Sequence, residues 1–353
     1  MAPASVEKEC CQGLITDLNR FVNQLIIIMN YLALLFVLFL KLSLMAQDCT
    51  QETLAQKPGT WKVGLKGSIS GITAADLTKE KAVLAGIHQM VSSNYSPTGC
   101  QLLYATAYEK YPMEGQTYIA DPYYYTMYIL RYICDGNSED KSKYYVDIST
   151  TTTVNIVANA MYWLNSLYAA NIPPGDFRGY LKLENRPVKK NGFYFLSNEN
   201  VDPKQEIVEY RWLITYNDTL PFNYLSRKEY LLIQRKRLEQ SVIDSPGSKT
   251  YAQKYFDKID EYLTKPESEL SQDAVCMWND EEWFEGFVEE GTRGSFIAVQ
   301  PNLSYFKKKL PKSSPQFFTV IYKLSQGDPV FEANIAAIKE AVDFTKLRSM
   351  LGK

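Results

Sequence analysis

The sequence YYYTMYILRYIC, residues 123–134, favours a β-strand, because tyrosine and isoleucine side chains fill a pleated surface well. Two further strand-like runs flank it, at residues 100–108 and 143–148. Turn signals such as Asp135-Gly136 separate these runs. The pattern predicts a group of antiparallel strands.

Helices are expected before and after this group of strands. Residues 73–91 combine a capping signature, Thr73 and Asp76, with apolar residues at helical spacing. His88 lies beside this apolar stripe, and we interpret it as a boundary packing residue. Residues 151–171 are predicted to form a second helix, because apolar residues recur there at similar spacing.

The remainder of the chain repeats this alternation. We expect strands at 180–184, 193–196, 207–216, 283–289, 294–300 and 316–324, and helices at 226–242, 251–263 and from 328 onward. Asn191-Gly192 predicts a hairpin turn, because both residues tolerate positive φ. Groups of antiparallel strands alternating with helices indicate an α+β fold, which we divide into two subdomains, residues 47–175 and 176–353.

An apolar run, Leu25–Met45, indicates where the protein is located. In one interpretation, residues 29–46 are a signal peptide that is cleaved before Gln47, and residues 1–28 are a non-native extension. In another, the residues before the run are a cytoplasmic extension and the run is an uncleaved membrane anchor. A buried core helix is a third interpretation. We favour cleavage, because LMAQDC, residues 44–49, resembles a processing site.

This interpretation determines which cysteines remain in the mature chain. Cleavage would remove Cys10 and Cys11 and leave the candidates for disulfide formation Cys49, Cys100, Cys134 and Cys276. Disulfides persist in an oxidising compartment, and four cysteines allow three pairings that the sequence does not distinguish. Independent buried thiols are the alternative. The spacings are too wide for a zinc ribbon or a C-x-x-C redox pair.

Composition excludes several classes of function. The net charge of −2 and the pI near 5.8 give no basic field for nucleic acid. A single histidine excludes a histidine-rich metal site, and the nucleotide-binding, zincin and serine-hydrolase motifs are absent from the sequence. We therefore expect no cofactor and no metal. The 26 tyrosines suit surfaces that contact glycans or proteins, although ordinary strand positions also account for them.

One acidic cluster is a catalytic candidate. Glu281, Glu282 and Glu285 lie beside Trp283 and Phe284, and glycosidases pair carboxylates with aromatic residues in this way. Acidic runs are more commonly solvated surfaces, so we expect a non-catalytic role for this cluster.

Two segments, YRWLITYNDTLPFNYLSRKEYL (210–231) and QPNLSYFKKKLPKSSPQFFTV (300–320), and the AQDC sequence at 46–49 resemble exported proteins of Bacteroidetes bacteria that have no known activity. The resemblance implies a cell-envelope or secreted location, periplasmic, cell-surface or extracellular, and agrees with a start at Met29.

These observations lead us to consider two functions. The first is an exported, non-catalytic binding protein that contacts a glycan, a peptide or an envelope protein. The alternative is an envelope glycoside or peptide hydrolase that uses the acidic cluster. A membrane contact is expected only through Leu25–Met45, if that run is not cleaved.

Overall fold

The structure is a computed structural model, which describes residues 49–64, 69–109, 120–160, 180–202, 206–278 and 283–353. The chain divides into two compact units, residues 1–51 with 134–145 and residues 52–133 with 146–353. The predicted apolar run, Leu25–Met45, lies outside the described residues. None of the described helices is both long and apolar enough to span a bilayer.

The first unit contains a disulfide between Cys49 and Cys134, whose Cα atoms lie 5.6 Å apart. The backbone N–H of Cys49 also donates a hydrogen bond to the carbonyl of Lys141, at 2.8 Å. The expected disulfide formation is thus confirmed for this pair. The two other candidates, Cys100 and Cys276, are buried free thiols.

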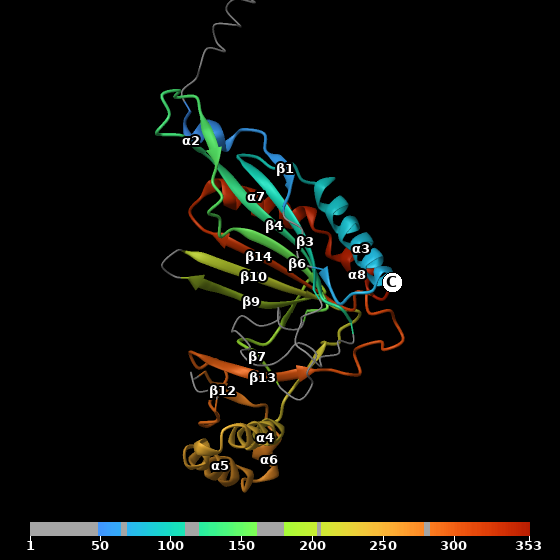
Figure 1. Ribbon diagram of the computed structural model, residues 1–353, viewed down its shortest axis with the longest axis vertical. Helices are drawn as coiled ribbons and strands as arrows, with labels where there is room; N and C mark the ends of the chain where they lie inside the picture. The colour runs from blue at the N-terminus through green and yellow to red at the C-terminus, as the bar shows by residue number, and fades with distance from the viewer. Residues whose placement is uncertain (1–48, 65–68, 110–119, 161–179, 203–205, 279–282) are drawn as a thin grey trace, which may run out of the picture. The chain divides into compact units, whose positions relative to one another are not determined.

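The second unit is built on a large mixed sheet (Figure 1). Its strands follow the order β1 (Thr60–Val63), β3 (Cys100–Glu109), β4 (Tyr123–Cys134), β6 (Thr153–Ala158), β14 (Phe318–Ser325), β10 (Ile207–Ile214), β9 (Phe193–Asp202) and β8 (Val188–Lys190). Strands β1 and β2 (Ile69–Ser70) pair with β3 in parallel, and the other neighbours in this order are antiparallel. A short strand, β5 (Tyr144–Val146), follows β4 along the chain.

Helices cover one face of this sheet. Alternate side chains of β4, which include Tyr123, Tyr125 and Met127, are buried together with residues of α3 (Ala74–Ser92), α7 (Pro329–Ala341) and α8 (Phe344–Met350). Figure 1 shows α3, α7 and α8 along this sheet. Each large apolar side chain buried in this way contributes about 1.5–3 kcal/mol. Tyr123 and Tyr125 therefore serve as core residues as well as strand formers.

A smaller sheet packs against the other face. It contains β7 (Leu181–Leu183), β11 (Phe222–Tyr224), β12 (Val275–Met277) and β13 (Ser295–Pro301). Leu183 and Ile297 of this sheet share a buried cluster with Leu213 of β10. A further cluster joins the small sheet to α4 (Arg227–Asp244), α5 (Lys249–Leu263) and α6 (Glu267–Leu270), with the 3-10 turn η2 (Pro246–Ser248) between α4 and α5. The antiparallel sheets mixed with helices confirm the predicted α+β class.

The predicted helix at residues 151–171 is wrong where the structure describes it. Residues 153–158 form strand β6, which lies between β4 and β14 in the large sheet. The run TTTVNIV is rich in β-branched residues, and burial on both faces of a sheet removes the alternation that marks a strand. Residues 161–179 lie outside the described residues, as does the predicted subdomain boundary at 175/176.

The predicted hairpin of residues 283–289 with 294–300 is also wrong in its first strand. β13 forms as expected, but its antiparallel neighbours are β7, β11 and β12. Residues 283–289 make only an isolated bridge, between Phe287 and Cys276. Gly286, with φ of 139°, interrupts the extended repeat that a strand requires. The Asn191-Gly192 turn, in contrast, joins β8 to β9 with positive φ at both residues, as predicted.

Candidate functional site

The predicted acidic cluster is only partly within the described chain. Glu281 and Glu282 lie outside the described residues, and Glu285 has an exposed side chain. Glu285 does not line the pocket described below. Trp283 and Phe284, its aromatic neighbours, pack instead with the core between α4, α5 and the small sheet.

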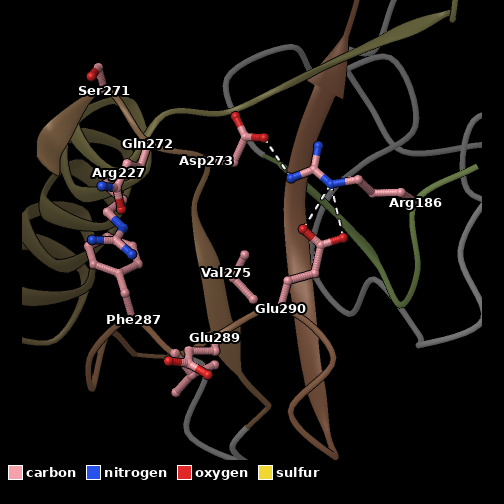
Figure 2. Close-up of a pocket in the computed structure, with 10 residues that line it drawn as sticks. Arg186, Arg227, Ser271, Gln272, Asp273, Val275, Phe287, Glu289 and Glu290 are labelled. Atoms are coloured by element: carbon pink, nitrogen blue, oxygen red, sulfur yellow. Dashed lines mark hydrogen bonds and ion pairs between the residues drawn. The ribbon is translucent and has the colours of Figure 1, made fainter. Parts of the chain in front are cut away.

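A pocket of about 680 Å³ lies at the end of the small sheet where β12 begins (Figure 2). Its walls come from the β7–β8 connection, the start of α4, the turn between α6 and β12, and the segment before β13. The lining residues are Arg186, Arg227, Ser271, Gln272, Asp273, Val275, Phe287, Val288, Glu289 and Glu290.

Backbone hydrogen bonds fix these walls. Ser226 caps α4 and forms a capping box with Glu229, which makes Arg227 the first residue of the helix. The backbone N–H of Arg227 donates to the carbonyl of Gln272 at 2.8 Å. The N–H of Val288 donates to the carbonyl of Val275 at 2.9 Å. Backbone hydrogen bonds therefore hold these walls in place around the two arginines of the pocket.

Arg186 bridges two carboxylates across the pocket, as Figure 2 shows. Its Nη2 lies 2.6 Å from Oδ2 of Asp273, and its Nε donates to the two carboxylate oxygens of Glu290 at 2.9 and 2.8 Å. The guanidinium carbon lies 4.3 Å from the centre of the Tyr224 ring, a cation–π distance. Burial disfavours the charge on Arg186, but the hydrogen bonds to Glu290 and Asp273 outweigh burial and raise the pKa of the guanidinium.

Arg227 has a different environment. Its guanidinium carbon lies 5.0 Å from the centre of the Phe287 ring, and its nearest carboxylate oxygen is that of Glu269, at 3.5 Å. Only 19 % of its side chain is exposed, and its Nε is buried without a hydrogen-bond partner. Within the described part of the chain, the Arg227 guanidinium makes no side-chain hydrogen bond that meets ordinary geometry.

A second group of acidic residues lies between α3 and the end of the large sheet. Glu80 of α3 is fully buried, and neither of its carboxyl oxygens has a hydrogen-bond partner. Burial, with the nearby charges of Asp121 and Asp76, raises the pKa of Glu80 to about 8. Asp76 itself accepts hydrogen bonds from Thr73 and Ser313. Among the described residues, no group of three or more histidine, cysteine or acidic side chains is arranged to hold a metal ion.

The single histidine is half-buried and packs among aromatic residues. Its Nδ1 is 2.8 Å from the hydroxyl oxygen of Tyr125, and its ring stacks on Tyr104 with centroids 4.1 Å apart. Burial lowers the pKa of His88. These contacts make His88 a packing residue rather than an exposed base.

Sequence reasoning did not find the pocket. Its residues come from separate stretches of chain, and no motif marks Arg186 or Asp273. The one available signal was the Ser226-Arg-Lys-Glu229 capping box, which locates Arg227 at a helix start. No family model, curated protein or solved structure matches the chain.

Proposed function

We propose that the protein is an exported, non-catalytic binding protein of the bacterial envelope, and that the pocket around Arg186 and Arg227 binds a glycan. The observation that carries this proposal is the engagement of both Asp273 and Glu290 by Arg186. A pocket with paired, oriented polar groups beside aromatic rings can bind hydroxyl groups and sugar rings.

The pairing of the carboxylates argues against acid–base catalysis in this pocket. A general acid must direct a carboxyl oxygen to the substrate atom that receives the proton. Asp273 and Glu290 each accept a hydrogen bond from the same guanidinium. This arrangement suits the orientation of a ligand better than proton transfer.

Two features support export. A disulfide between Cys49 and Cys134 is typical of a chain that folds in an oxidising compartment. The sequence before Cys49 contains the apolar run Leu25–Met45, which has the composition of a signal peptide or an anchor.

Binding to an array of oligosaccharides and peptides tests this function. We expect the full-length protein to bind at least one arrayed glycan, and Arg186→Ala to weaken that binding about 10-fold or more, because it removes charge-assisted hydrogen bonds that order the pocket. Arg235→Ala is the matched control, because Arg235 also pairs with two carboxylates, Glu239 and Asp260, but lies outside the pocket. Thermal unfolding of each variant verifies folding.

The same array decides between binding and hydrolysis. Exchange of Glu281, Glu282 and Glu285 together for glutamine should leave glycan binding unchanged. Hydrolysis of an arrayed glycan or peptide by the unaltered protein, lost in this triple variant, would contradict the proposal and support the hydrolase alternative. Absence of binding to every arrayed ligand would also contradict it.

A further inference from the structure

The two arginines of the pocket differ in how their N–H donors are used. Arg186 directs its guanidinium to Asp273 and Glu290 and makes short hydrogen bonds to both. Arg227 makes no such bond within the described chain, and its closest approach to a carboxylate, that of Glu269, is 3.5 Å. Arg186 is thus engaged by two carboxylates, whereas Arg227 forms a longer ion pair, with Glu269, and makes no such short hydrogen bond within the described residues.

The burial of Arg227 makes this lack of a short hydrogen bond within the described residues unusual. A guanidinium has donors only and stays charged, so a mostly buried arginine normally gives its N–H groups to acceptors. The Nε of Arg227 is shielded from solvent and has no acceptor. Leaving a buried charged donor unsatisfied costs free energy.

The surroundings of Arg227 also hold it in place. Its backbone is fixed by the first turn of α4 and by the hydrogen bond to Gln272. The ring of Phe287 lies beside the guanidinium, as Figure 2 shows. A planar guanidinium held by a helix end and an aromatic ring is suited to bidentate binding of a carboxylate.

We propose that the Arg227 guanidinium binds a carboxylate group of the ligand, and that the ligand of this pocket is an acidic glycan of the uronic acid type. This inference rests on the proposed function and names the class of its ligand. Asp273, Glu289 and Glu290 line the same pocket and supply acceptors for sugar hydroxyl groups. A ligand with closely spaced phosphates would bring more negative charge near these carboxylates than a chain with isolated carboxylates, and would therefore be repelled more strongly.

Calorimetric titration with a galacturonic acid trisaccharide and with the neutral maltotriose tests this proposal. We expect the full-length protein to bind the acidic trisaccharide at least about 10-fold more tightly than the neutral one, as one charge-assisted hydrogen-bonded pair allows. Arg227→Gln should abolish this preference, because it weakens binding of the acidic trisaccharide more than binding of maltotriose. Arg227→Lys should give an intermediate preference, since lysine keeps the charge but not the fork of donors.

Lys228→Gln is the matched control. Lys228 is the next residue of α4, is exposed, pairs with Glu267 and does not line the pocket. The substitution removes the same charge, so it should leave the preference intact. Circular dichroism and thermal unfolding verify that the first turn of α4 persists in each variant.

The outcomes separate the two proposals. If the protein binds both trisaccharides equally and Arg227→Gln changes neither affinity, the carboxylate subsite is wrong and the glycan pocket stands. If Arg186→Ala also has no effect on any arrayed glycan, the proposed function fails. Binding of an acidic peptide that requires Arg227, without binding of the galacturonic acid trisaccharide, would overturn the assignment of an acidic glycan.

Discussion

Glu80 illustrates the cost of a polar group in the core of this fold. Its carboxyl group is fully buried beside the large sheet and has no hydrogen-bond partner. A buried carboxyl without a partner is more stable in its neutral form, which agrees with the pKa of about 8. Glu80 is therefore protonated in the folded chain between about pH 4.5 and about pH 8, where an exposed glutamate is charged.

This property predicts how stability depends on pH. The pKa of Glu80 is raised above the value of 4.5 in an unfolded chain, so the folded state binds this proton more tightly. Its contribution is fully present below about pH 4.5 and is lost as the pH rises to about 8. The loss is on the order of 3–5 kcal/mol, at about 1.4 kcal/mol for each pKa unit.

Glu80→Gln tests this prediction. Glutamine does not titrate, so the free energy of unfolding of the variant should fall less than that of the unaltered protein between about pH 5 and about pH 9. Urea unfolding at the two pH values measures the difference, and Glu285→Gln, an exposed site, is the control. An identical pH dependence in both proteins would show that Glu80 is ionised in the folded state.

At the residue scale, the helix caps and the hairpin turn were the most predictable features. The Thr73 cap of α3, the Ser226 capping box of α4 and the Asn191-Gly192 turn each depend on a few neighbouring residues, and the structure contains all three. The roles of Glu80 and Arg227 depend on which side chains the fold brings near them. No local pattern of residues encodes those neighbours.

At the element scale, the start of α4 links helix stability to the pocket. The hydroxyl of Ser226 accepts a hydrogen bond from the N–H of Glu229, and the Glu229 carboxylate accepts one from the N–H of Ser226. This reciprocal cap fixes the first turn, which contains Arg227.

Ser226→Ala should therefore affect both stability and binding. Loss of the cap is expected to lower the free energy of unfolding by about 1 kcal/mol. The affinity for the acidic trisaccharide should fall as well, because Arg227 is no longer held in place. Chemical denaturation and calorimetry measure the two effects. Ser248→Ala is the control, since Ser248 precedes α5 without a side-chain capping bond. A stability loss without any change in affinity would contradict the link between cap and subsite.

The wrong prediction of a helix at residues 151–171 has an element-scale cause. β6 lies between β4 and β14, with Val154 and Ile156 buried on one face and Val157 on the other. A strand buried on both faces lacks the alternation of polar and apolar residues by which a strand is predicted from sequence. Pairing partners far along the chain, rather than local periodicity, determine this strand.

At the scale of the whole molecule, the number of free cysteine thiols depends on whether the N-terminal segment is cleaved. The Cys49–Cys134 disulfide leaves Cys100 and Cys276 as thiols. Cleavage before Gln47 would remove Cys10 and Cys11. A C-terminally tagged protein should therefore be found outside the cytoplasm, with an N-terminus at or near Gln47 and with two free thiols after denaturation without reduction.

N-terminal sequencing and thiol counting of the recovered protein test this expectation. A chain that retains residues 1–46 carries Cys10 and Cys11 as well, so additional free thiols or an intact start would contradict cleavage. Recovery of the whole chain in the soluble cytoplasmic fraction would contradict export.

The α+β class was predictable from alternating strand and helix patterns, whereas the order of strands was not. β14, residues 318–325, occupies the middle of the large sheet, between β6 and β10. It pairs along its length with both neighbours, for example through Ile321 with Asn155 and with Arg211. Pairings across such long stretches of chain leave no local signature in the sequence.

The central place of β14 has a kinetic consequence. Strands β1 to β6 and strands β8 to β10 are made first, but they become one sheet only when β14 is inserted between them. Until then the growing chain presents β6 and β10 as open edges, and closing such distant pairings is slow. The large sheet can therefore be completed only after nearly all of the chain has been synthesised, as far as residues 318–325.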